Sequence, residues 1–332
     1  MINYNSCGTI TNPNSSALGP TFKKGTPIKK LFLAFFLLMA APAFAENENN
    51  QIGITPYLYR YEPNYVGFTH DNDATDNAFI DFKISVMAPL LPKWFNLNTQ
   101  YGNVFLAVTI RAGQYLERES SPVIAKTFSP KIFYRHWNDS NKNEDSSYID
   151  IGYAHLSNGQ SIHTLDQFKQ QAASEQDPTR ALDHVSRGWD YVELLVKRAT
   201  IFNDSKYQGY ISLKHFLDYG LLQSKSENYY AWEEADNLKG INRVNGLKFT
   251  VKKIHGKNFD LFNVRTRDYK TVLTYETGIG SPFEFHTIRI EESLRLFEIP
   301  VMVWYQNGYS NDFAQYYKRT SSYGIAYEIG GF

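Results

Sequence analysis

A histidine, a serine and a later aspartate in this sequence are spaced as in a nucleophilic hydrolase. His155 and Ser157 lie two residues apart in the run 148–157, and Asp190 follows after a long polar stretch. A serine hydroxyl becomes a good nucleophile when an imidazole takes its proton, and a carboxylate on the other ring nitrogen orients the imidazole and stabilises its charged form. These residue types therefore indicate ester or amide hydrolysis by a Ser/His/Asp triad.

The alternation of side chains places the three groups on one side of a sheet. In the run 148–157, His155 and Ser157 share a face with two isoleucines and a tyrosine, and Asp190 shares its face with Val192 and the aliphatic residues that follow. Successive strand residues point to opposite sides, and in a membrane barrel the apolar face meets lipid. We therefore expect all three groups to face lipid on neighbouring strands. A histidine in an interface girdle beside an ordinary Ser-Asn-Gly turn is the alternative.

The elements that must position these residues are strands. Alternating runs that are typical of strands occur at 79–87, 104–115, 129–136, 148–156, 191–200, 207–216, 271–277, 299–305 and 323–329. With roughly 20 to 25 residues for each strand and its connection, residues 46–332 would form about 12 strands, an even number as in bacterial barrels. The prediction is an all-β fold, a transmembrane antiparallel β-barrel in one domain. The polar stretch 161–185 is expected to be a long loop with a short helix near 165–173.

Residues 1–45 have the pattern of a secretory signal with an N-terminal extension. Lys29 and Lys30 precede the apolar run 31–41, which ends at an Ala-Phe-Ala cleavage pattern over 43–45. The only cysteine, Cys7, lies in this segment, so neither a disulfide framework nor cysteine catalysis is expected. Removing the segment takes away four lysines and no acid, so 34 basic and 34 acidic residues become 30 and 34. No basic footprint for nucleic acid remains.

Aromatic residues decide between two remaining classes of β-protein. The chain after residue 45 has no apolar run of helix-spanning length, which excludes a helical membrane protein. A soluble periplasmic β-protein and a transmembrane barrel both remain possible. The 24 tyrosines, 23 phenylalanines and a final Phe332 favour the barrel, whose strands are short, alternating and rich in aromatic residues at the membrane interface.

Two short strings carry a family resemblance. His-Leu-Ser-Asn-Gly-Gln-Ser at 155–161 and Ser-Arg-Gly-Trp-Asp at 186–190 resemble the signature of outer-membrane phospholipase A. The resemblance implies a phospholipase A1/A2 in the bacterial outer membrane, acting on sn-1 and/or sn-2 acyl esters of glycerophospholipids. It assigns Ser157 as nucleophile, His155 as general base and Asp190 as the residue that orients the histidine.

The same resemblance implies calcium dependence and activity as a homodimer. By that matching, the side chain of Ser186 and the carbonyl of Gln160 bind Ca²⁺, and Ser120 of a second copy reaches the same ion. The backbone N–H of Gly159 and calcium-bound water form the oxyanion hole. Calcium prefers oxygen ligands of these kinds, and its charge stabilises a developing oxyanion.

The sequence departs from the family pattern at four places. Asp190 stands where well-studied members have asparagine, Gln160 stands where an arginine often follows the Asn-Gly pair, the loop 161–185 is longer, and the run 108–115 does not reproduce the family's usual dimer-interface segment. Because the expected ligand at Gln160 is a carbonyl, calcium binding is expected to survive this change. Two further readings stay open: a structural or channel barrel of the same descent without catalysis, and an esterase acting on another membrane lipid.

Overall fold

The computed structural model describes residues 58–72, 78–90, 102–116, 123–138, 145–233, 240–255, 259–261, 264–266, 269–296 and 299–329. The predicted signal segment, residues 1–45, and the predicted calcium ligand Ser120 lie outside these residues. No helix within the described ranges is long and apolar enough to cross a membrane.

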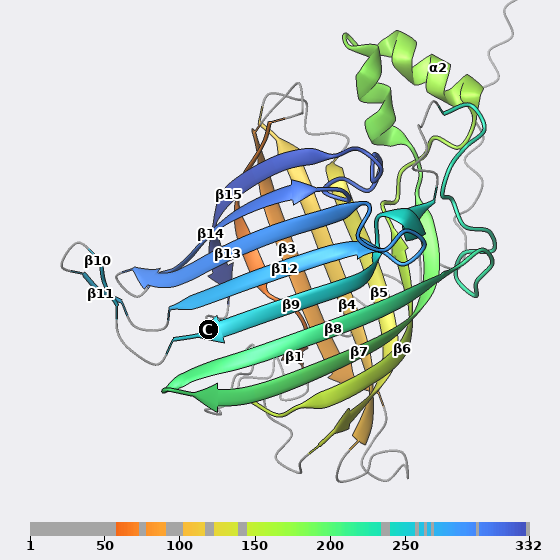
Figure 1. Ribbon diagram of the computed structural model, residues 1–332. Helices are drawn as coiled ribbons and strands as arrows, with labels where there is room; N and C mark the ends of the chain where they lie inside the picture. Colours follow the sequence, from red (N-terminus) through yellow and green to blue (C-terminus); the bar gives the residue numbers. More distant parts are fainter. Residues whose placement is uncertain are drawn as a thin grey trace, which may run out of the picture. The chain divides into compact units, whose positions relative to one another are not determined.

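Antiparallel strands make up most of the described chain (Figure 1). The strands are β1 (Tyr59–Arg60), β2 (Asn64–Asp71), β3 (Ala78–Pro89), β4 (Gly102–Tyr115), β5 (Ile124–Trp137), β6 (Tyr148–Ser157), β7 (Gly188–Phe202), β8 (Ser205–Leu217), β9 (Gly246–Ile254), β10 (Phe259–Leu261), β11 (Val264–Thr266), β12 (Lys270–Gly278), β13 (His286–Leu296), β14 (Ile299–Gly308) and β15 (Thr320–Ile329). The helices are α2 (Leu165–Ser174), η1 (Pro178–His184) and η2 (Ile241–Arg243).

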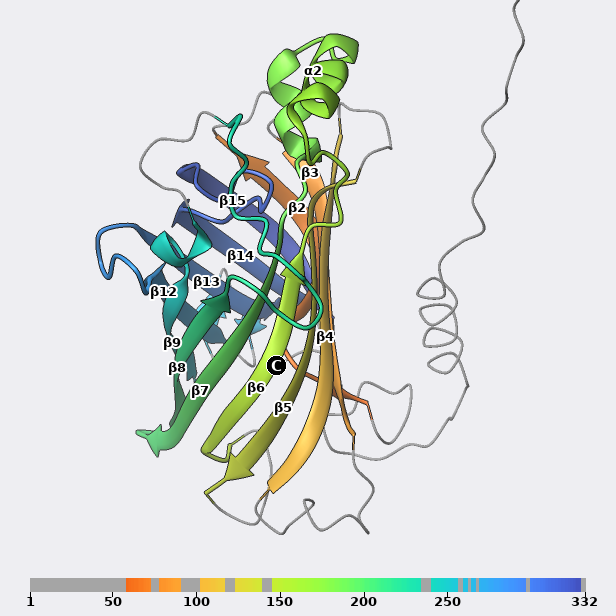
Figure 2. The same ribbon diagram turned by 90° about the vertical axis from the view of Figure 1, so that its right-hand side faces the viewer.

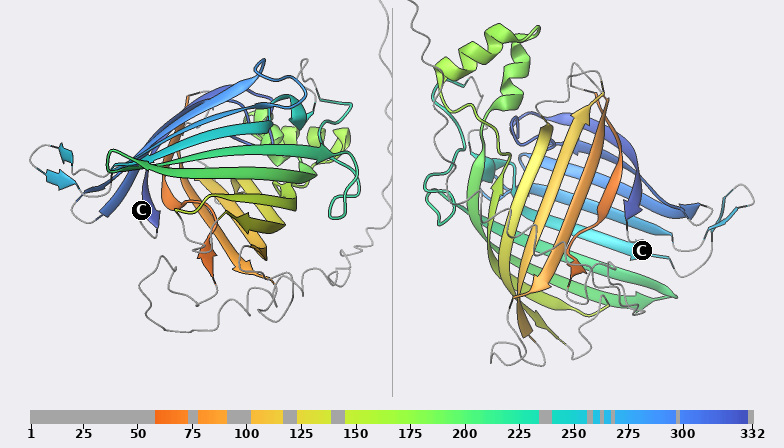
Figure 3. Two further views of the ribbon diagram at one scale, coloured as in Figure 1. Left: turned by 60° about the horizontal axis from the view of Figure 1, so that its bottom comes forward. Right: turned by 180° about the vertical axis from the view of Figure 1, so that it is seen from behind.

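Twelve of these strands form a closed barrel, which confirms the predicted fold. From β2 to β9, and then from β12 to β15, each strand pairs with its neighbour in sequence. β9 pairs with β12, and β15 pairs with β2, so the ring of the described strands closes. The short β1 continues the edge of β2 along β3, and β10 and β11 form a separate hairpin. Figure 3 shows the closed ring from two further directions.

Apolar side chains cover the outside of the barrel, as expected for a wall that meets lipid. Residues from strands all around the ring are between 47% and 55% exposed, namely Phe68, Ile84, Ile151, Ile211, Val251 and Ile325.

The two-residue turn between β7 and β8 has positive φ at both Asn203 and Asp204, the twist that suits a tight hairpin.

Charged side chains fill the interior as ion pairs. Among the described residues, buried pairs between strands are Arg135–Asp150, Lys131–Glu193, Lys270–Glu328 and Arg111–Asp81. The guanidinium of Arg135 donates to both oxygens of Asp150, at 2.7 and 2.8 Å. The interior of the barrel is therefore polar, and its charges neutralise one another across the strands.

The two longest connections lie at one end of the barrel, the end at which β6 finishes and β7 begins. We call it the site end. Residues 158–187, 218–245 and 309–319 connect strands there, and α2 extends from it (Figure 2). The predicted helix near 165–173 is confirmed as α2, which begins after a capping box formed by Thr164 and Gln167. The 3₁₀ helix η1 was not predicted.

Candidate active site

Strands β6 and β7 bring His155 and Asp190 together. The two residues are direct partners in the antiparallel register, and His155 Nδ1 lies 2.7 Å from Asp190 Oδ1. Along the same face, Ile151 and Val192 are 55% and 40% exposed. The expectation that these strands are neighbours and that the pair lies on the outer, lipid-facing side is therefore met.

Ser157 is the last residue of β6 and shares the face of His155. Its partner across the strands is Gly188, which has no side chain to cover the hydroxyl from that strand. Because Asp190 occupies Nδ1 of His155, the other ring nitrogen, Nε2, is left to receive a proton from the serine. Asp190, His155 and Ser157 therefore lie on one face of two neighbouring strands.

Asp190 is only 1% exposed, although its face of the strand points outward. Residues 218–223, which we call the capping loop, cover it. The backbone N–H groups of Leu222 and Gln223 donate to Asp190 Oδ2 at 2.7 and 3.0 Å, and the Tyr153 hydroxyl donates to the same oxygen. Sequence reasoning missed these partners, because the loop lies about 30 residues further along the chain, a separation that no local pattern bridges.

Asn158 joins the two segments that carry the sequence signature. Its side-chain N–H donates to the carbonyl of Val185 at 2.8 Å, and its Oδ1 accepts from the backbone N–H of Arg187 at 2.9 Å and of Gln160 at 3.3 Å. The side chain is 2% exposed. Gly159 follows with φ +61, a left-handed conformation that glycine adopts without strain. No role was predicted for Asn158 from the sequence, although it belongs to the signature string at 155–161.

Replacing Asn158 by alanine is therefore expected to disturb the turn on which Gly159 and Gln160 depend. The change removes one donor and one acceptor and leaves buried backbone groups unpaired, at a cost of about 1–3 kcal/mol for each unsatisfied group. We expect a lower melting temperature and a loss of the predicted hydrolase activity that exceeds the loss of folded protein. Ser161→Ala, an exposed change in the same segment, is the control. Equal behaviour of the two variants would show that Asn158 does not hold the turn.

The predicted calcium ligands Ser186 and Gln160 lie on two segments that run side by side. Ser186 N donates to the carbonyl of Ile162 at 3.0 Å, and Asn158 N donates to the carbonyl of Arg187 at 3.1 Å. Gln160 therefore lies between two hydrogen bonds that join its segment to the segment of Ser186. The hydroxyl of Ser186 donates to Glu227 Oε2 at 2.8 Å.

Oxygen atoms of the kinds that calcium prefers are therefore present at this place. Because the proton of Ser186 points to Glu227, the lone pairs of its hydroxyl oxygen are free to face a cation. In the part of the chain that the structure describes, no cluster of three or more His, Cys, Asp or Glu side chains could hold a metal. A calcium site here must therefore rest on hydroxyl, carbonyl and water oxygens, with at most a carboxylate or two.

Arg187 anchors the loops of the site end. Its guanidinium forms a buried ion pair with Glu233 and donates to the carbonyl of Ala314 at 3.1 and 3.2 Å and to that of Asn228 at 3.3 Å. Burial disfavours its charged form, but the hydrogen bonds and the charge of Glu233 outweigh burial and raise the pKa of the guanidinium. One side chain thus ties the signature segment to two other loops.

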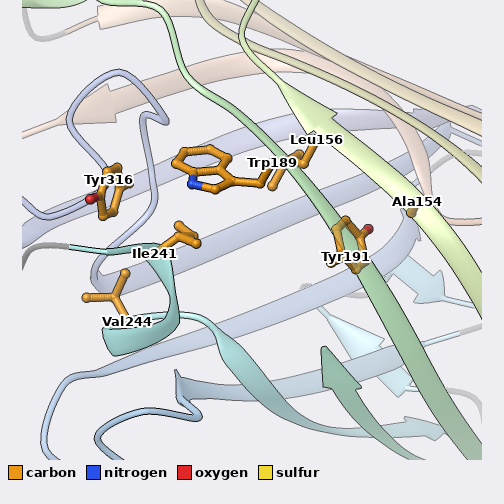
Figure 4. Close-up of a cluster of buried hydrophobic side chains, with 7 residues drawn as sticks. All are labelled: Ala154, Leu156, Trp189, Tyr191, Ile241, Val244 and Tyr316. Atoms are coloured by element: carbon orange, nitrogen blue, oxygen red, sulfur yellow. The ribbon is translucent and has the colours of Figure 1, made fainter. Parts of the chain in front are cut away.

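A hydrophobic cluster supports the inner side of the same strands (Figure 4). Its buried members are Ala154, Leu156, Trp189, Tyr191, Ile241, Val244 and Tyr316. Trp189 lies between Leu156 and Tyr316, and the rings of Trp189 and Tyr316 meet edge to face at 5.5 Å. Leu156 and Trp189 alternate with the site residues along β6 and β7. Packing of this inner face therefore holds the outer face in place.

Comparisons with known proteins agree with this architecture. Residues 43–165 match the model of the phospholipase A1 family. This match includes His155 and Ser157 and ends before Ser186 and Asp190. No curated protein sequence matches the chain.

Three solved structures share the fold. The outer-membrane phospholipase A of Escherichia coli aligns at 15% identity over 82% of this chain and 94% of its own, with a TM-score of 0.54. An active-site mutant of the same protein aligns at 13% identity over 87% and 95%, with a TM-score of 0.56. A calcium-bound dimer of the Salmonella typhi outer-membrane phospholipase aligns at 14% identity over 82% and 92%, with a TM-score of 0.55. The fold is therefore that of outer-membrane phospholipase A.

Proposed function

We propose that this chain is a calcium-dependent phospholipase A of the outer membrane that hydrolyses acyl esters of glycerophospholipids with Ser157, His155 and Asp190. The phospholipase class of the enzyme and the outer-membrane β-barrel follow from the matched family model and the shared fold. The observation that carries the finer proposal is the 2.7 Å contact between His155 and Asp190 on the lipid-facing wall, with Ser157 two residues beyond.

The position of the triad suits a lipid ester. Ser157 ends β6 and Asp190 is the third residue of β7, so the reacting groups lie near the edge of the barrel wall. Phospholipid esters lie at the boundary between headgroups and acyl chains, which is the level that strand ends of such a barrel reach. The exposed Ile151 and Val192 below the triad offer an apolar wall to the acyl chains.

Each member of the triad has a defined task. His155 takes the proton of Ser157 as the serine oxygen attacks the ester carbonyl, and later donates it to the leaving alcohol. Asp190 keeps Nδ1 of the imidazole protonated and stabilises the imidazolium that forms. Water then attacks the acyl-serine with the same histidine as base. The products are a lysophospholipid and a fatty acid.

The turn after Ser157 is the best place for an oxyanion hole. The N–H of Gly159 is available there because Asn158 holds the turn, and the positive φ of Gly159 sets its direction. Ser186 and the carbonyl of Gln160 would hold Ca²⁺ beside this turn. When bound, the ion would supply positive charge to stabilise the developing oxyanion.

Dimerisation is proposed from a distant relative and from the family resemblance. A structure of the Salmonella typhi relative is a dimer with bound calcium. By the family resemblance, Ser120 of a second copy would complete the calcium site of this chain. In the sequence, Ser120 falls between the last residue of β4, Tyr115, and the first residue of β5, Ile124, outside the residues that the structure describes.

Removal of calcium provides the test of this function. Refolded protein in mixed phospholipid and detergent micelles is expected to release fatty acid with Ca²⁺ and to lose about 100-fold or more of the rate with EDTA, as for the loss of one oxyanion-hole interaction. Calcium should also raise the melting temperature, because a ligand that binds only the folded state stabilises it. Ser186→Ala should weaken that rise.

Three results would contradict the proposal. Equal rates with calcium and EDTA would remove the metal from the mechanism. No release by the folded barrel under any condition would favour the structural or channel barrel. Release of acyl chains from lipid A but not from glycerophospholipid would assign the same triad to another lipid.

A further inference from the structure

The capping loop carries exposed apolar side chains beside the triad. Tyr219, Leu221 and Leu222 are 72%, 86% and 62% exposed, and Leu221 is the most exposed large apolar residue of the described chain. The loop covers Asp190 on the outer side of β7, so these side chains lie on the same wall as Val192. A polar loop would be the ordinary choice for a connection in water. Apolar residues at this place indicate contact with lipid.

The loop is attached to the triad itself. Leu221 N donates to the Tyr153 hydroxyl at 2.7 Å, and Tyr153 donates in turn to Asp190 Oδ2. Within the loop, Gly220 N donates to the carbonyl of Gln223 at 2.9 Å. A Cβ on Gly220 would lie 2.0 Å from Asp190 Oδ2, so the backbone approaches the carboxylate as closely as glycine permits.

This attachment requires a carboxylate at position 190. One oxygen of Asp190 serves His155 and the other accepts two backbone N–H groups of the loop. An asparagine has only one acceptor oxygen, and its NH₂ group would face donors either at His155 or at the loop. The aspartate of this chain therefore matches a docked loop in a way that asparagine cannot.

We propose that the capping loop is the acyl-chain contact of the substrate site, with Tyr153 as the positioning residue that docks it on Asp190. This inference rests on the proposed function and names which part of the chain holds the substrate. Because Asp190 binds the loop through one oxygen and His155 through the other, Leu221 and Leu222 stay at a constant place relative to the reacting serine. An acyl chain that lies along the outer wall from Ser157 gains apolar contact with these leucines.

Kinetics with two acyl lengths test the contact. Leu221→Asn/Leu222→Asn is expected to raise KM for 16-carbon acyl chains by about tenfold, with little change for 8-carbon chains and in kcat, because it removes binding that ground state and transition state share. Tyr153→Phe should give the same pattern to a smaller degree. The control is Ile201→Asn/Phe202→Asn, an apolar pair at the opposite end of β7 that is 67% and 64% exposed. This pair should leave both KM values unchanged.

The outcomes separate this inference from the proposed function. If the leucine variant has the KM of the wild type for both lengths while hydrolysis persists, the loop is not the acyl contact. If Tyr153→Phe lowers kcat equally for both lengths and leaves KM unchanged, Tyr153 orients Asp190 only, and the docking part fails. A wild type that releases no fatty acid defeats the proposed function.

A binding measurement that needs no turnover tests the inference even when the wild type releases no fatty acid. Tyr219→Trp in a Ser157→Ala background reports on the loop through quenching by phospholipid with brominated acyl chains, diluted in detergent micelles. Saturable quenching at low mole fraction is expected for a bound acyl chain, and Phe202→Trp in the same background should show only quenching in proportion to the mole fraction. Proportional quenching at both positions would overturn the inference.

Discussion

Replacing Ser157 by alanine is expected to reduce fatty-acid release by roughly 10⁴-fold or more while the barrel stays folded. The alanine removes the oxygen that forms the acyl-enzyme, and no neighbouring group on the same face can replace it. The residual rate would come from polarisation of the ester by the oxyanion hole. Release from mixed micelles with calcium measures the effect, and a heat-dependent shift in gel mobility shows that the variant is folded.

Non-additivity shows whether the serine acts with His155. Residues that work as one unit are not additive, so Ser157→Ala/His155→Ala should be no slower than Ser157→Ala alone. The contact between His155 and Asp190 supports this expectation. Losses that multiply in the double variant would mean that the two residues act independently, and would sink the assignment of a triad.

Replacing Arg187 by methionine is expected to have the largest effect on stability. The ion pair with Glu233 is almost fully buried, with side chains 0% and 1% exposed. Removing one partner leaves an uncompensated buried charge, which costs about 3–5 kcal/mol. The carbonyls of Ala314 and Asn228 also lose their donor. Denaturant unfolding in detergent or lipid measures the free energy, and hydrogen exchange in residues 309–319 locates the change.

Two further variants test whether the loss of stability comes from the unpaired buried charge. Arg187→Met/Glu233→Leu should recover part of the stability, because it removes both charges and leaves no ion unpaired. Lys206→Met breaks the ion pair with Asp145, whose side chains are both 45% exposed, and should change the free energy of unfolding by no more than about 1 kcal/mol. If Arg187→Met costs as little as Lys206→Met, Arg187 does not anchor the loops.

Alternation in the sequence was enough to predict most of the wall of the barrel. Nine strands were predicted at positions that the structure confirms. An apolar outer face and a polar inner face make the polarity of the side chains alternate along a strand with a period of two residues. β2 (Asn64–Asp71), β9 (Gly246–Ile254) and β13 (His286–Leu296) were missed as individual runs. In β9 and β13, lysine, arginine and glutamate interrupt the apolar pattern, and in the structure Glu291 pairs with Arg289 within β13. The count of about 12 came from chain length instead.

Some features of the predicted site were also determined by the sequence, and others were not. That His155 and Ser157 share a face is a local property of one strand, so the sequence determined it. That Asp190 stands opposite His155 follows from the register of two strands, which the sequence allowed but did not prove. The chemistry of the residue types indicated the roles of these three residues, and the resemblance supplied the calcium ligands, which no period or spacing contains.

Only the tertiary structure decided what surrounds the triad. Asp190 is buried although its strand face points outward, because the capping loop folds back over it through Leu222 and Gln223. Arg187 meets Glu233 and Ala314, which follow it by 46 and 127 residues. Strand periodicity is a property of residues that are close in the sequence. These contacts instead give the buried polar groups of one loop hydrogen-bond partners in another loop. The sequence alone determined that His155 and Ser157 share one face of a strand, and the packing of the loops at the site end decided how Asp190 and the signature segment are held beside them.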